Sequence, residues 1–244
     1  MELSGCGYLF SILRIFWLYV PAKAVCVFRE NWRIYMPKLI YLEASPRKER
    51  SHSSDIAKEF IDSYKESYPT DEVETINIWD LVLPEINGEL LNARYAIAQG
   101  QQFTSTQEEA WKQVVDIFEQ FNSGTKYLFS LPMWNFGIPY KLKHFIDVVT
   151  QPGLSFSFSQ ETGYQGLING RPASVVYARG EEYGLESGVE DKDFQRPYFE
   201  IWLKFIGFTD IRPVVIEPTM KGDEMVNLVK AFNRDHIRKI AKEV

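Results

Sequence analysis

The sequence predicts an α/β domain in which a doubly wound, five-stranded parallel sheet carries helices on both faces. Short apolar segments rich in β-branched residues alternate along the chain with longer segments of helical periodicity. Strands that are apolar throughout are typical of parallel sheets, and the intervening helices supply the crossovers that parallel strands need. No internal repeat or low-complexity tract interrupts this alternation.

The first two predicted strands flank one helix. Residues 39–42 form an apolar run that ends before Ser45-Pro46, and residues 73–79 alternate with a high β-branched content. Between these strands, one helical face carries Ile56, Ala57, Phe60, Ile61 and Tyr64.

The middle of the chain contains the best-defined helix. Residues 80–104 are predicted to be irregular because Pro84 and Gly88 act as breakers. Ser105-Thr106-Gln107-Glu108 has the pattern of a capping box, and the helix that follows it is expected to stop at Gly124. Its inner face carries Trp111, Val114, Val115, Phe118 and Phe121.

The second half repeats strand and helix. Residues 127–131, 173–177 and 213–216 predict the last three strands, and residues 154–158 predict a β-hairpin. Helices are expected to begin at Pro139 and Pro197. The last helix is expected to bury Met225, Val229, Phe232 and Ile240.

Composition excludes several classes of function. The chain has 27 Lys and Arg against 33 Asp and Glu, a formal charge of −6, without a long basic run, so no nucleic-acid partner is expected. Cys6 and Cys26 are the only cysteines, which leaves the rest of the chain without a disulfide or a cysteine nucleophile. His52, His144 and His236 are far apart in the sequence, so no metal site is expected.

Residues 1–35 differ from the rest of the chain. Residues 3–28 are mostly apolar, but Arg14 interrupts them, which makes both a membrane-spanning helix and a signal peptide marginal. Met36-Pro37-Lys38 resembles an ordinary protein start. We interpret residues 1–35 as an appended segment, the sole source of any membrane contact, and residues 36–244 as a domain that folds without it.

Ligands of doubly wound sheets bind beyond the carboxyl ends of the strands, where three loops are predicted to meet. The first loop brings Ser45, Ser51, His52 and Ser53 to the start of a helix, where hydroxyls, backbone N–H groups and the helix dipole favour a phosphate. It lacks the glycine patterns of nucleoside triphosphatases and dinucleotide folds, which favours a mononucleotide monophosphate. A polar turn with an N-cap serine is the alternative.

The second loop places Met133, Trp134, Asn135 and Phe136 between two prolines. Core aromatics seldom stand beside an amide and turn residues, so a pocket for a flat ligand is favoured over simple packing.

The third loop contains Ala178, Arg179, Gly180 and Glu181 after the fourth strand. Gly180 permits close approach of a flat ring, although a simple turn would use the same residue. We expect a solvated loop and no metal site from the acidic residues that follow, Glu182, Glu186, Glu190 and Asp191. His144 and His236 are expected on helix surfaces.

Together these loops resemble the FMN-dependent NADH:quinone oxidoreductases and azoreductases, a family of homodimeric enzymes with a flavodoxin-like fold. The resemblance runs from Met36 to near the C-terminus and is strongest at residues 132–136, 138–139, 142–143, 153–158, 166–167 and 179–180. It implies non-covalent FMN, with the phosphate at Ser45 and residues 51–53 and the flavin ring at residues 133–136 and 178–181.

The resemblance also implies a function. NADH or NADPH would reduce the FMN, and a quinone or an azo compound would then be reduced in a ping-pong reaction, in a cytoplasmic homodimer. No catalytic acid or base is expected, because the cofactor carries the chemistry. The alternative is a flavodoxin-like electron carrier or FMN-binding sensor without a substrate of its own.

Two residues depart from the family pattern. Trp134 stands where the family usually has tyrosine, and Glu181 replaces the second glycine of an Arg-Gly-Gly pattern. A carboxylate close to the anionic reduced flavin would oppose its reduction unless it points to solvent.

Overall fold

The computed structural model describes residues 37–98, 101–102, 104–184 and 186–244. The interpretation of residues 1–35 as an appended segment therefore concerns residues outside the described part of the chain. Within the described ranges, no helix is both long enough and apolar enough to cross a membrane.

The central sheet confirms the predicted architecture. Its strands are β1 (Lys38–Glu43), β2 (Glu72–Asn77), β3 (Lys126–Pro132), β6 (Ala173–Ala178) and β7 (Ile211–Ile216). They lie in the order β2-β1-β3-β6-β7, and every pairing is parallel. The strand order reverses between β1 and β3, so their carboxyl ends form the switch point at which ligands bind in such sheets.

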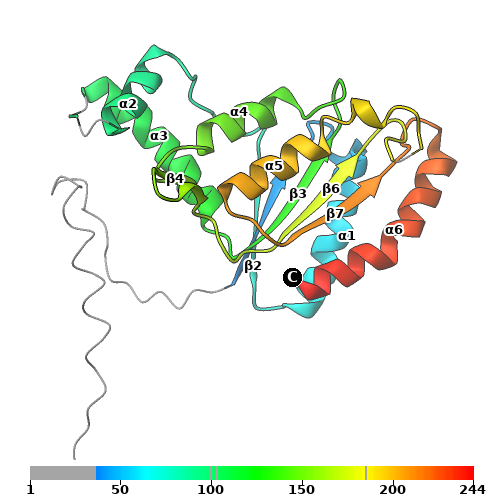
Figure 1. The fold of residues 1–244 in the computed structure, drawn as a ribbon. Coiled ribbons are helices and arrows are strands. Elements are labelled where there is room, and N and C mark those ends of the chain that lie inside the picture. The colour runs from blue at the N-terminus through cyan, green and yellow to red at the C-terminus, as the bar shows by residue number, and fades with distance from the viewer. Residues whose placement is uncertain (1–36, 99–100, 103, 185) are drawn as a thin grey trace, which may run out of the picture.

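Helices cover both faces of the sheet, as predicted (Figure 1). One face carries α1 (His52–Ser67) and α6 (Asp223–Glu243). The other face carries α3 (Ser105–Asn122), α4 (Tyr140–Val149) and α5 (Arg196–Ile206). Among the described residues, short 3-10 helices lie in two loops, η2 (Lys48–Arg50) and η3 (Glu190–Lys192).

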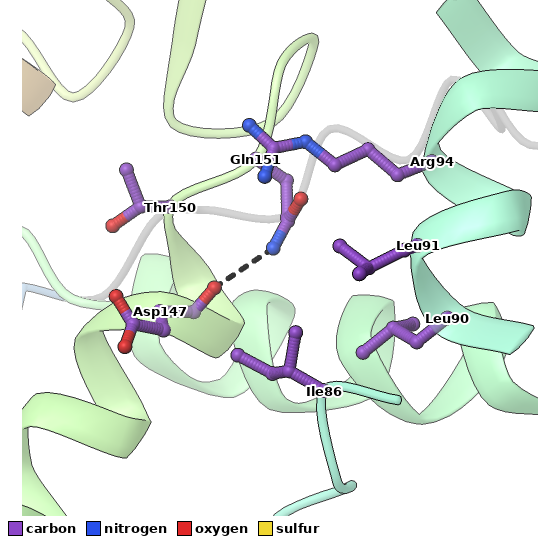
Figure 2. A pocket seen from close by; sticks show the side chains of 7 residues that line it. All are labelled: Ile86, Leu90, Leu91, Arg94, Asp147, Thr150 and Gln151. Carbon is purple, nitrogen blue, oxygen red and sulfur yellow. Dashed lines mark hydrogen bonds between the residues drawn. The ribbon is translucent and has the colours of Figure 1, made fainter. Parts of the chain in front are cut away.

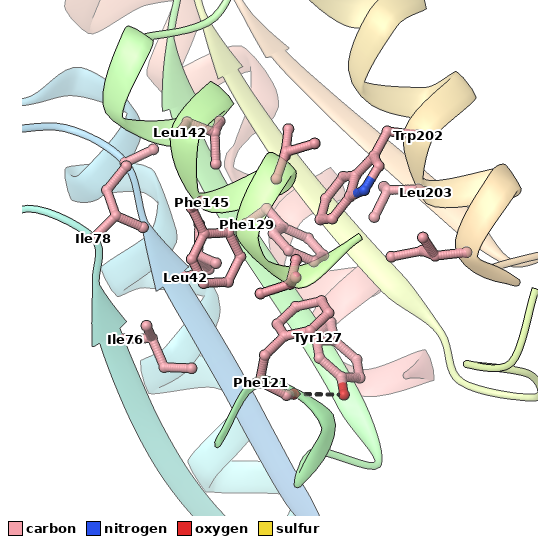
Figure 3. Close-up of a cluster of buried hydrophobic side chains, with 14 of the residues drawn as sticks. Leu42, Ile76, Ile78, Phe121, Tyr127, Phe129, Leu142, Phe145, Trp202 and Leu203 are labelled. Atoms are coloured by element: carbon pink, nitrogen blue, oxygen red, sulfur yellow. Dashed lines mark hydrogen bonds between the residues drawn. The ribbon is translucent and has the colours of Figure 1, made fainter. Parts of the chain in front are cut away.

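Two apolar cores fill the space between the sheet and its helix layers. Successive residues of a strand point to opposite faces, so Leu128 packs with α1 and α6 while Phe129 faces α3, α4 and α5. The ring of Phe129 is fully buried, 5.3 Å from the ring of Phe199 and 6.0 Å from that of Tyr127 between centroids. Figure 3 shows this aromatic cluster between the sheet and the helices.

The prediction that residues 80–104 are irregular is wrong, because they contain α2 (Gly88–Ala98). Asn87 Oδ1 accepts a hydrogen bond from the Leu90 N–H at 3.1 Å. Leu90 and Ala93 are buried. Gly88 therefore begins the helix instead of breaking it, since Asn87 caps the free N–H groups of the first turn.

The capping box of α3 begins one residue earlier than predicted. Thr104 Oγ1 accepts from the Gln107 N–H at 3.3 Å, and Gln107 Oε1 accepts from the Thr104 N–H at 3.0 Å. Residues 104–108 contain two overlapping copies of the motif, because Ser105 and Glu108 have the same spacing. In the structure, the first copy, Thr104 with Gln107, forms the capping box.

The inner face of α6 also differs from the predicted one. Ile240 is buried, but Phe232 is 87% exposed and Met225 is 36% exposed. The positions buried instead include Val226 and Ile237. Apolar side chains occur on more than one face of this helix, so its periodicity did not determine which face packs inward.

A hairpin is present but extends beyond the predicted residues 154–158, as β4 (Phe156–Ser159) and β5 (Gly163–Gly166). It packs against the end of α5 through backbone atoms, since a Cβ on Gly166 would lie 2.3 Å from the Gly207 nitrogen. Gly207 ends α5 at a φ of 117°, which a side chain would strain. This junction therefore depends on both glycines.

The two remaining histidines differ in exposure. His236 is exposed on α6, as predicted. His144 was expected on a helix surface, but it is half-buried and donates a hydrogen bond from Nε2 to the Pro84 carbonyl oxygen at 2.8 Å. The loop before α2 supplies this partner.

We predict that Phe129→Ala lowers the free energy of unfolding by about 3–5 kcal/mol, because it opens a cavity in the packed aromatic cluster. Chemical denaturation measures this change. The matched control is Phe232→Ala, which removes an exposed ring and should change stability by less than about 0.5 kcal/mol. Equal effects of the two substitutions would contradict the assignment of Phe129 to the core.

Candidate functional site

A pocket of about 160 Å³ lies at the carboxyl ends of β1, β3 and β6. It brings together residues from all three loops singled out in the sequence, namely Ser45, Ser51, His52, Ser53, Met133, Trp134, Ala178 and Gly180. The topological switch point of the sheet is therefore also where the expected ligand-binding loops converge.

Three buried serines surround the start of α1. Ser51 is its N-cap and accepts a hydrogen bond from the Ser54 N–H at 3.2 Å. The hydroxyl oxygens of Ser51 and Ser53 are 3.1 Å apart. Ser45, Ser51 and Ser53 are all less than 5% exposed. Free N–H groups, hydroxyls and the helix dipole thus point at one place, which suits an anion.

The positive charge beside the start of α1 comes from Arg47 and not from His52. His52 is half-buried, and burial, together with Lys230 and Arg47, lowers the pKa of its imidazole below the usual value of 6.5. It is therefore neutral at pH 7 and can donate a hydrogen bond. Arg47 is exposed and lines the pocket.

The second loop makes a tight turn after β3. Trp134 and Gly137 exchange two backbone hydrogen bonds of 2.9 Å, with Asn135 at φ 46° and Phe136 at φ 69° between them. Such values are uncommon outside glycine. Asn135 and Phe136 are exposed and lie outside the pocket lining, whereas the Met133 N–H donates to the Ala178 carbonyl at 2.8 Å.

An aromatic cluster holds the indole of Trp134 in place. The rings of Trp79 and Tyr140 lie 5.7 Å and 6.3 Å from it between centroids. Trp79 is itself fixed, because its Nε1–H donates to the Ala44 carbonyl at 3.1 Å. The pocket therefore has an aromatic wall of defined position, as a flat ligand requires.

Arg179 supports the third loop from beneath. Its side chain is 3% exposed and forms ion pairs with Asp193 at 2.8 Å and Glu217 at 3.3 Å. Its Nε–H also donates to Gln195 Oε1 at 3.1 Å. The guanidinium is thus directed into the protein and does not line the pocket, in contrast to its neighbours Ala178 and Gly180.

Gly180 lies close to the segment that follows β7. A Cβ at this position would lie 2.7 Å from Met220 Sδ, and the N–H groups of Thr219 and Met220 both donate to the Gly180 carbonyl at 3.1 Å. Glu181 points to solvent, with 58% of its side chain exposed and Lys221 Nζ 3.9 Å away.

Sequence reasoning missed four residues of the pocket lining, Arg47, Pro132, Thr219 and Met220. Arg47 stands inside the first loop, and Thr219 follows the last strand at the same edge of the sheet. Searching the loop after β7 as well would have found Thr219 and Met220. In the described part of the chain, no cluster of three or more His, Cys, Asp or Glu could hold a metal ion.

Comparisons with known proteins point in the same direction. Residues 37–240 match the sequence model of a family described as having a flavodoxin-like fold. The FMN-dependent NADH:quinone oxidoreductase of Desulfotalea psychrophila is 46% identical over 209 residues, which cover 86% of this chain and 98% of that protein. The corresponding protein of Nitratidesulfovibrio vulgaris is 46% identical over 187 residues, 77% of this chain and 89% of that protein.

Solved structures show the same fold. An azoreductase of Bacillus anthracis superposes with a TM-score of 0.78 at 26% identity, covering 86% of this chain and 100% of that one. An FMN-dependent NADH-azoreductase of the same species, in complex with FMN, has a TM-score of 0.75 at 28% identity and covers 85% of this chain and 99% of that one.

We predict that Arg179→Met lowers the free energy of unfolding by about 3–5 kcal/mol, because it leaves two largely buried carboxylates unpaired. Arg47→Met removes the same charge from an exposed position and should cost less than about 0.5 kcal/mol. Denaturation of both variants tests the difference. Similar losses would mean that the Asp193 and Glu217 ion pairs do not stabilise the loop.

Proposed function

Because this chain belongs to the FMN-dependent NADH:quinone oxidoreductases, a family with a flavodoxin-like fold, we propose that it binds FMN non-covalently and passes electrons from NADH or NADPH to quinones or aromatic azo compounds. The observation that carries this proposal is the convergence of a buried serine cluster and an aromatic wall at one switch point. The relatives are named as oxidoreductases, which favours an enzyme over an electron carrier or a sensor.

The residues present fit the two chemical ends of FMN. Its phosphate is a dianion that needs several converging donors, and Ser45, Ser51 and Ser53 supply them at the start of α1. Arg47 adds a positive charge, and neutral His52 adds a hydrogen-bond donor. We assign these residues to the phosphate end.

The flavin ring is assigned to the other side of the pocket. Met133, Trp134, Asn135 and Phe136 would border it on one side, and the backbone of residues 178–181 on the other. Trp134 provides an apolar wall wider than a tyrosine would. Arg179 contributes as a positioning residue, since its ion pairs hold the loop that meets the ring.

When bound, FMN supplies hydride and two-electron chemistry, which we propose proceeds by a ping-pong sequence of two half-reactions. The protein's own residues bind the cofactor, orient it and exclude water. No catalytic acid or base is assigned. The negative charge of Glu181 opposes reduction of the bound flavin only weakly, because its carboxylate is exposed to solvent and lies near Lys221.

We also propose that the site is completed in a homodimer that acts in the cytoplasm. The pocket of about 160 Å³ is smaller than the roughly 300–1,000 Å³ that ligand sites usually enclose, so part of the ring must lie outside it. Beside the pocket Phe136 and Tyr140 are exposed, and at the C-terminal end of α5 the hairpin exposes Phe158 and Tyr164. An apolar surface of this kind suits a second copy of the chain.

The proposed activity predicts that NADH, added without oxygen, bleaches the absorbance of bound FMN within seconds and that a quinone or an azo dye restores it. Absorbance at the oxidised flavin band measures both steps. Protein that keeps oxidised flavin in the presence of excess NADH and NADPH would indicate a carrier or a sensor.

We predict that the double variant Ser51→Ala/Ser53→Ala binds FMN at least about 100-fold more weakly, because hydrogen bonds to a charged group are worth about 1.5–3 kcal/mol each. Equilibrium dialysis measures the affinity. Ser51 also caps a helix, so Thr104→Ala, which removes the N-cap of α3 away from the pocket, is the control and should leave FMN affinity unchanged. Undiminished affinity in the double variant would refute the assignment of the phosphate end.

The homodimer proposal predicts that the protein sediments as a dimer at working concentrations. Phe158→Ser should shift the equilibrium towards the monomer, because it replaces an exposed aromatic ring on the hairpin. Phe232→Ser on α6 is the control. A fully active monomer would contradict the proposal.

A further inference from the structure

A second cleft lies between α2 and the C-terminal end of α4 (Figure 2). Its volume is about 390 Å³, within the roughly 300–1,000 Å³ of small-molecule sites. One side is apolar and formed by Ile86, Leu90 and Leu91. Ile86 and Leu91 remain 39% and 38% exposed, so these side chains are only partly covered by the protein itself.

The cleft is separate from the candidate site. Tyr140 at the start of α4 packs against Trp134 of that site, whereas Asp147, Thr150 and Gln151 at the other end line the cleft. The 10 residues of α4 separate the two ends by roughly 15 Å, at 1.5 Å per residue. No residue lines both pockets.

Two of the polar side chains that line the cleft are already used within the protein. Asp147 pairs with Lys143, whose Nζ lies 2.6 Å from its carboxylate. The Thr150 hydroxyl donates to the Ile146 carbonyl and accepts from Trp202 Nε1–H at 2.9 Å. Neither group is therefore left to determine which ligand binds.

Gln151 and Arg94 retain unused polar groups. Gln151 is 4% exposed, and its Nε2 donates to the carbonyl oxygens of Asp147 at 2.9 Å and Val148 at 3.1 Å. Two carbonyl partners fix the orientation of the amide, since only its nitrogen can donate to them. Its Oε1 is buried without a hydrogen-bond partner among the described residues. The half-buried Arg94 likewise has no acidic partner in the part of the chain that the structure describes.

We propose that this cleft binds a small organic carboxylate whose body is apolar and which carries one hydrogen-bond donor. The guanidinium of Arg94 would pair with the carboxylate, and the donor would reach Gln151 Oε1 (Figure 2). Because unpaired buried acceptors are costly, a donor that displaces the side chains covering this oxygen gains more than it would at an exposed site. The apolar body would lie against the leucines of α2.

The test uses 4-hydroxybenzoate as the probe, with the full chain loaded with FMN, and titration calorimetry as the readout. The unsubstituted protein should bind this probe at least tenfold more tightly than benzoate, which lacks the donor, and than 4-hydroxybenzamide, which lacks the charge. This measurement does not depend on flavin reduction, so it is independent of the proposed enzymatic activity. Absence of binding, or equal binding of the three compounds, would overturn the proposal.

Variants locate the bound probe. Arg94→Gln should weaken binding at least tenfold, and Arg94→Lys should recover most of that loss. Gln151→Met should remove the preference for 4-hydroxybenzoate over benzoate. Arg238→Gln makes the same change of charge on the exposed surface of α6 and should have no effect. Binding that is insensitive to Arg94→Gln, or that falls equally in Arg238→Gln, places the probe elsewhere and overturns the proposal.

Discussion

The parallel pairing of β1, β3 and β6 is the constraint on which the candidate site depends. Because the three strands run in one direction, their carboxyl ends reach the same edge of the sheet, and the loops that follow them must meet there. The aromatic core beneath β3 holds this edge in place from one side, and α1 holds it from the other. Residues separated by more than a hundred positions in the sequence thereby come to line one pocket.

A buried ionic network fixes the position of the third loop, residues 178–181. Arg179 is joined to Asp193 and Gln195, which immediately precede α5, and to Glu217, which follows β7. Burying these charges is costly, and the cost is offset only while every partner is present. The same carboxylate of Glu217 also accepts the Tyr183 N–H at 3.1 Å. The network therefore ties the loop after β6 to the segment after β7.

The sequence was sufficient to predict the five strands and the convergence of three loops, because buried parallel strands leave a continuous apolar signal. The sequence was not sufficient where two local conformations, or two faces of a helix, have similar energies. α2 was missed because the cap at Asn87 outweighs the breaker Gly88. The inner face of α6 was predicted wrongly because this helix carries apolar side chains on more than one face. The inward direction of Arg179 depends on acidic partners that only the tertiary structure brings together.

The glycine junction between the hairpin and α5 determines how the hairpin can behave. Backbone packs directly against backbone at Gly166 and Gly207, and the rings of Phe156 and Tyr164 lie 4.9 Å and 5.6 Å from that of Phe205 between centroids, so the hairpin is held closely against α5. The aromatic pair at its tip, Phe158 and Tyr164, packs at 4.9 Å between ring centroids. A second subunit docking there, as proposed, would meet a preorganised surface and lose little conformational entropy on binding, so the hairpin would serve as a rigid surface for association and not as a mobile lid.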